Sequence, residues 1–85
     1  MKTVMLDGSL YASSDEVYGA LAAMLSLPPY FGRNADALND CLGEFPVPVS
    51  LWIASYGEDG VASCIRLIAE VFADNGGTVK EIEGE

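Results

Sequence analysis

Apolar residues occur along this chain in two patterns, short continuous runs and longer stretches with helical spacing. The short runs lie at Thr3 to Leu6, Val49 to Ala54 and Thr78 to Ile82, each bounded by polar or turn-forming residues, and they indicate strands. The second run is almost wholly apolar, which is typical of a strand covered on both faces in a parallel sheet. Trp52 within it is expected to pack in or beside the core rather than to bind a ligand.

The first predicted helix begins with a capping box, in which Ser13 is followed three residues later by Glu16. The helix should end near Ser26, since Pro28 cannot continue it. No side chain from Val17 to Gly32 is charged, and a helix that is apolar nearly all round is usually buried on both sides. Either a neighbouring element covers this helix, or two copies of the chain form a weak homodimer through it.

Two further helices are predicted, a short one within residues 35–42 and a longer one from Val61 to Asp74 that stops at Asn75-Gly76. Strands that alternate with helices favour an α/β fold, here a small three-stranded parallel sheet packed with about three helices. Residues 1–85 are expected to form a single domain, because this length is enough for one marginal core.

The segment from Leu27 to Leu42 is the most informative part of the chain. On a helical wheel centred on Leu38, Asp36 and Asp40 lie about 20° either side of the opposite pole. The apolar residues within about 60° of Leu38 are Ala35, Cys41 and Leu42. One helix face should therefore pack on the core, while the other presents two carboxylates, one turn apart, to solvent.

The residues before this helix are suited to hold it rigidly. Pro28-Pro29 stiffens the approach, and Gly32 permits a tight turn. Asn34 can cap the helix by accepting a hydrogen bond from its first free amides.

The two aspartates carry a local cost. At this spacing they repel one another by about 0.2–0.5 kcal/mol. The helix dipole favours Asp36 in the first turn but opposes Asp40 near the last, and no lysine or arginine lies three or four residues from Asp40. An uncompensated cost often marks a functional surface. The alternative is a solvated acidic face, and the wheel alone does not decide between them.

Composition narrows the possible partners. Thirteen acidic and four basic residues give a net charge of −9, which repels nucleic acid and anionic membranes and favours cationic partners. The chain has no histidine, the usual general base and metal ligand near neutral pH. No cofactor and no metal site are therefore expected.

The cysteines and the N-terminal residues bear on location. Cys41 and Cys64 lack CxxC spacing and are expected to be buried free thiols in a reducing compartment. The apolar run after Met1-Lys2 is too short for a signal peptide, so a cytoplasmic location is expected.

The segment from Leu27 to Leu42 resembles the barstar family of intracellular ribonuclease inhibitors. Elsewhere the likeness extends only to the order of strands and helices. The residues that match the family pattern are Leu27, Pro28, Tyr30, Phe31, Gly32, Asn34, Asp36, Ala37, Leu38, Asp40, Cys41 and Leu42.

The resemblance implies a stoichiometric inhibitor, not an enzyme, that blocks the basic active site of a secreted-type, barnase-like ribonuclease. Asp40 would enter the phosphate pocket, and Asp36 would pair with an arginine beside it. Tyr30 would pack near the catalytic histidine, while Asn34 and the Gly32 backbone would bond to the guanine-recognition loops. The partner-binding residues expected on this basis are Tyr30, Phe31, Gly32, Arg33, Asn34, Asp36, Asn39, Asp40, Gly43 and Glu44.

The chain departs from the family pattern within this surface. Arg33 stands where the type member has an acidic residue, and it could pair with Asp36. Asn39 replaces a tryptophan, and Glu44-Phe45 stands where the family has a glycine and a tryptophan. These changes leave the target enzyme open.

Two departures lie further along the chain. The loop from Tyr56 to Gly60 looks too short for an additional helix of the type member. Ungapped alignment places Val71 at the position of a supporting glutamate, with Glu70 only its neighbour.

Two other functions remain open. A barstar-like immunity or interaction module could bind a basic partner that is not a ribonuclease. An enzyme could use Asp36 and Asp40 as paired carboxylates or hard-metal ligands, but no cleft, histidine or third ligand is predicted beside them.

Overall fold

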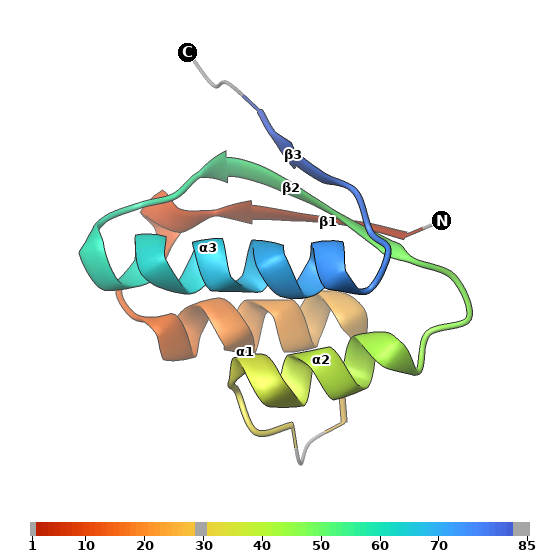
Figure 1. Ribbon diagram of the computed structural model, residues 1–85. Helices are drawn as coiled ribbons and strands as arrows, with labels where there is room; N and C mark the ends of the chain where they lie inside the picture. Colours follow the sequence, from red (N-terminus) through yellow and green to blue (C-terminus); the bar gives the residue numbers. More distant parts are fainter. Residues whose placement is uncertain (1, 29–30, 83–85) are drawn as a thin grey trace.

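The computed structural model describes residues 2–28 and 31–82 (Figure 1). Strands β1 (Lys2–Asp7), β2 (Val49–Ser55) and β3 (Val79–Glu81) form one parallel sheet in the order β1-β2-β3. Leu51 at the centre is in register with Val4 on one side and Val79 on the other. The predicted three-stranded parallel sheet is confirmed.

In the part of the chain that the structure describes, three α-helices accompany the sheet, namely α1 (Ser14–Leu25), α2 (Ala35–Gly43) and α3 (Asp59–Asp74). The α/β fold predicted from the sequence is therefore confirmed. Between β2 and α3, residues 56–58 form no helix, as expected for so short a loop. A short 3-10 helix (Gly8–Leu10) after β1 was not predicted; Asp7 caps it by accepting a hydrogen bond from the Ser9 amide at 3.0 Å.

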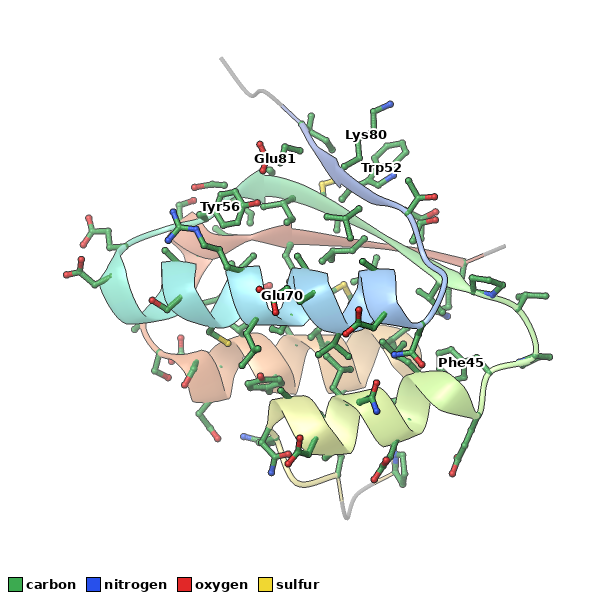
Figure 2. All side chains as sticks on the ribbon, viewed as in Figure 1. Phe45, Trp52, Tyr56, Glu70, Lys80 and Glu81 are labelled. Carbon is green, nitrogen blue, oxygen red and sulfur yellow. The ribbon has the colours of Figure 1, made fainter. Side chains whose placement is uncertain are left out.

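All three helices lie on one face of the sheet (Figure 1). The prediction that β2 is covered on both faces is therefore wrong. Met5 and its register partner Trp52 project from the uncovered face with 51% and 37% of their surface exposed. Lys80 lies over the Trp52 ring at 5.6 Å (Figure 2). The apolar run misled because three short helices cover only one side of the sheet.

The core fills the space between the sheet and the helices. Leu6 and Leu51 from the sheet are fully buried, as are Leu21, Leu38 and Ile65 from the three helices. Each fully buried leucine or isoleucine contributes about 1.5–3 kcal/mol relative to an exposed one. Every helix therefore has at least one side chain anchored in the same core.

The capping box of α1 forms with one change. The Ser13 hydroxyl accepts from the Glu16 amide at 3.4 Å, as predicted. The Glu16 carboxylate accepts from the Ala12 amide at 2.8 Å instead of reaching the Ser13 amide. The backbone amides of Ala12 and Glu16 therefore both have a hydrogen-bond acceptor.

The uncharged face of α1 is partly covered by other elements. Tyr18 is 5% exposed, and its ring packs against Phe31 at 6.2 Å between centroids. The Arg33 guanidinium lies against Gly19. A neighbouring segment thus covers these positions, while Ala23 and Ser26 stay exposed. The weak homodimer through this helix remains a prediction.

We expect the free energy of unfolding to fall at high pH, because the Tyr18 hydroxyl ionises less readily in the folded chain than in the unfolded one. Burial, followed by the negative charge of Cys64 and a hydrogen bond with it, raises the pKa of Tyr18 to about 12. The unfolded chain loses this proton near pH 10, so the contribution is complete below pH 10 and is lost as the pH rises towards 12. Urea unfolding at pH 9 and pH 12 should show a loss of about 2 kcal/mol from this group. Tyr18→Phe should lose correspondingly less stability over the same interval, and an identical loss in both proteins would contradict the assignment.

Candidate partner-binding site

Helix α2 begins at a side-chain cap. The Asn34 side-chain oxygen accepts a hydrogen bond from the Ala37 amide at 2.8 Å, which confirms the predicted role. The Asn34 amide group also donates to the Gly32 carbonyl at 3.2 Å. The cap therefore joins the start of the helix to the segment that leads into it.

The two faces of α2 are as the wheel predicted. Leu38 and Leu42 are buried, at 0% and 6% exposure, while Asp36 and Asp40 are exposed. Neither carboxylate takes part in a hydrogen bond or ion pair within the described part of the chain. Both are thus available to a cationic group from outside.

The turn before α2 differs from the prediction. The backbone enters the left-handed region at Arg33, with φ of 56°, and not at Gly32. Gly32 instead eases the packing here, because a Cβ there would lie 3.2 Å from the Asn34 side-chain nitrogen, closer than usual, and 3.5 Å from the Ala37 Cβ. The glycine therefore makes room for the Asn34 cap.

Arg33 pairs with Asp15 on α1, at 2.7 Å, and not with Asp36, the partner that the sequence allowed. The guanidinium also lies beside Gly19, where a Cβ would be 3.8 Å from its atoms, an ordinary van der Waals contact. Its charge is thus neutralised on the α1 side and does not offset the carboxylates of α2. The pair connects the turn before α2 to the first helix.

Asn39 is engaged inside the molecule. Its side-chain oxygen accepts from the Asn75 amide group at 2.8 Å, and the same amide group donates to the Val71 carbonyl at 2.8 Å. Asn75, which sequence reasoning treated only as the stop of α3, therefore also links the C-terminal end of α3 to α2. Gly43 ends α2, and Glu44 follows it as an exposed C-terminal cap residue.

The remaining expected residues differ in position. Tyr30 lies outside the described residues. Phe31 is partly buried against Tyr18. Val71 is buried, and Glu70 is exposed on α3 (Figure 2), so the supporting glutamate of the family pattern has no direct counterpart at that position.

Both cysteines are free thiols; Cys64 is buried, but Cys41 is only partly buried, contrary to expectation.

A cavity of about 260 Å³ lies beside Asp40, where no cleft was predicted. A larger cavity of about 880 Å³ lies at the ends of β1 and β2, and neither Asp36 nor Asp40 lines it. In the described ranges no group of three histidine, cysteine or carboxylate side chains could hold a metal ion, and no helix there is long and apolar enough to cross a membrane.

Over the described residues, three helices lie on one face of a three-stranded parallel sheet, and the capped helix α2 exposes two carboxylates that have no partner there. This arrangement defines a small α/β protein with an exposed acidic helix. The chain belongs to the barstar family. The family model described as Barstar (barnase inhibitor) matches residues 1–76, which confirms the resemblance seen in the sequence. The family is one of inhibitors, in agreement at family level with the expectation that the chain is not an enzyme.

A curated relative supports the same class. A protein of Bacillus subtilis (strain 168) named "Putative ribonuclease inhibitor YrdF" is 33% identical over 57 residues. The match covers 66% of this chain and 63% of the relative, so the chain aligns with less than two thirds of the relative's length.

We expect Asn34→Ala to lower the free energy of unfolding by about 1 kcal/mol, because the Ala37 amide would lose its acceptor. Asn34→Asp and Asn34→Ser should keep most of the stability, since both residue types cap helices. Urea unfolding of the three variants measures the difference. Equal destabilisation by alanine and serine would show that the cap contributes little.

A double-mutant cycle should identify the partner of Arg33. Both side chains of the Arg33–Asp15 pair are at least half exposed, so the coupling free energy should be about 0.2–1 kcal/mol and should shrink in high salt. The cycle combines Arg33→Gln with Asp15→Asn and follows urea unfolding. A matched cycle with Asp36→Asn should show no coupling, and a larger coupling to Asp36 would contradict the structure.

Proposed function

We propose that this chain inhibits a barnase-type ribonuclease stoichiometrically, by placing the outer face of α2 in the basic active site of the enzyme. The observation that carries the proposal is the pair of exposed carboxylates, Asp36 and Asp40, for which the described chain supplies no cation. The family and the name of the relative support the class of target.

The chemistry of such an enzyme explains why carboxylates would serve. A ribonuclease holds the phosphates of RNA with cationic side chains, and arginine forms strong, directional bonds with carboxylates as it does with phosphates. Asp36 and Asp40 are one helical turn apart, roughly 6 Å, which is close to the spacing of phosphates along a strand. We assign Asp40 to the phosphate pocket and Asp36 to an arginine beside it.

The surroundings of α2 would lower the cost of binding. The helix is held by the Asn34 cap, by buried Leu38 and by the Asn39–Asn75 hydrogen bond. A surface that is already ordered loses less conformational entropy when a partner binds. The net charge of −9 would also draw the chain towards a basic enzyme, more strongly at low salt than at high salt.

The proposal extends to the rest of the expected surface and to the place of action. Within the single domain that we propose for residues 1–85, the contact surface would include Tyr30, Phe31, Gly32, Arg33, Asn34, Asn39, Gly43 and Glu44 beside the two aspartates. The target would be a secreted-type ribonuclease, met in the cytoplasm of the cell that makes it. Two free thiols are consistent with a reducing compartment.

Titration of the chain into a barnase-type, guanyl-preferring ribonuclease, with RNA cleavage as the readout, tests the proposal. We expect inhibition that is complete at one equivalent and weaker in high salt. Asp40→Ala should raise the dissociation constant a hundredfold or more, because loss of one partner of a buried ion pair costs about 3–5 kcal/mol.

Glu58→Gln is the matched control, because it removes the same charge from an exposed position outside α2 and should leave inhibition unchanged. Inhibition that survives Asp40→Ala would refute the role of that residue. No inhibition of any ribonuclease tested would favour a barstar-like module with a basic partner of another class.

A further inference from the structure

A groove beside Asp40 is lined by residues of α2 and by Pro28, Phe31 and Gly32. Pro28, Phe31, Ala37 and Cys41 supply its apolar part, and Asp40 and Glu44 are its acidic residues. Its volume is about 260 Å³. Sites that bury a whole small molecule are larger, at about 300–1,000 Å³. The groove is therefore of a size to suit one side chain.

The carboxylates of Asp40 and Glu44 both line the groove. Asp40 lies in the last turn of α2 and Glu44 is the cap residue four positions later, so their like charges repel. The negative charges of Glu44 and Asp40, added to the effect of burial, raise the pKa of the Cys41 thiol. Glu44 also lies at the C-terminal end of α2, where the helix dipole disfavours a negative charge. A cation in the groove would offset both the repulsion between the two carboxylates and the unfavourable effect of the helix dipole on Glu44.

The chain's four basic side chains are all placed elsewhere. Arg33 pairs with Asp15, Arg66 lies over the Tyr56 ring at 5.3 Å, and Lys80 lies over Trp52. Lys2 lines a different cavity, at the start of β1. The charge of Asp40 and Glu44 is therefore not offset from within the described part of the chain.

A bare metal ion fits the groove poorly. Ca²⁺ and Mg²⁺ require six or more oxygen ligands, and the described residues bring no third carboxylate or thiol into a metal-binding group with this pair. Most of the lining is apolar, and a metal ion does not use an apolar surface. A cation at the end of an aliphatic stem uses both parts of the groove.

We propose that this groove binds a lysine or arginine side chain of the partner protein, with Glu44 as a specificity-determining residue. The stem would lie on Phe31 and Pro28, and the charged end would lie between Asp40 and Glu44. The identification of that partner as a ribonuclease rests on the proposed function; the chemistry of the groove does not. A chain without an acidic residue at position 44 would lack half of this charge.

The groove can be tested without any enzyme, by titrating argininamide into the ¹⁵N-labelled chain. We expect saturable amide shifts at Gly32, Ala37 and Cys41, and none at Glu58 and Asp59 in the distant cavity. Citrullinamide, which has the same shape but no guanidinium charge, should give none. Glu44→Gln should weaken binding about two- to fivefold, and Glu58→Gln should leave it unchanged. Equal shifts with citrullinamide, no saturation, or no effect of Glu44→Gln would overturn the proposal.

A second experiment separates this proposal from the proposed function. In a complex with a barnase-type ribonuclease, a side chain seated in the groove should slow alkylation of Cys41 by iodoacetamide at least tenfold, as followed by peptide mass spectrometry. Glu44→Gln should reduce both inhibition and protection. Inhibition with neither effect would overturn the groove proposal and leave the proposed function standing. If the wild-type chain does not inhibit the enzyme, the proposed function fails and the argininamide titration alone decides on the groove.

Discussion

The burial of Leu38 determines how α2 can present its charges. Leu38 has no exposed surface, and Leu42 one turn later is nearly as buried, so the helix cannot rotate about its axis without removing both from the core. At 3.6 residues per turn, the side chains opposite them are those of Asp36 and Asp40. The apolar anchor and the acidic face are thus two consequences of one helical period, and the position of either sets that of the other.

The distribution of the few positive charges is the second constraint on this surface. Arg33 pairs with Asp15, and Lys80 lies over the Trp52 ring. Neither side chain therefore forms an ion pair with a carboxylate of α2. A lysine or arginine beside Asp40 would stabilise the isolated helix but would compete with any external cation. The unneutralised face therefore costs the free protein a little stability and leaves the carboxylates unoccupied.

The elements that sequence reasoning predicted well are those that depend on local rules. The Asn34 cap and the outward direction of Asp36 follow from spacing and capping chemistry over a few residues, and the parallel sheet follows from the alternation of strands and helices. The contacts that it missed join distant segments: Arg33 meets Asp15 across 18 positions, and Asn39 meets Asn75 across 36. Local rules also could not show that the helices gather on one face of the sheet, because an apolar run does not reveal what lies on its far side.

These missed contacts change the meaning of the departures from the family pattern. Arg33 and Asn39 looked from the sequence like altered contact residues, yet their side chains are bound to α1 and α3 and hold α2 in place. Glu44 differs from both, because it is exposed and lines a groove with Asp40. A residue that is already hydrogen-bonded must give up that bond to contact a partner, whereas a free carboxylate need not. If this chain recognises a different partner from that of the type member of the family, the difference should therefore depend more on Glu44 than on Arg33 or Asn39.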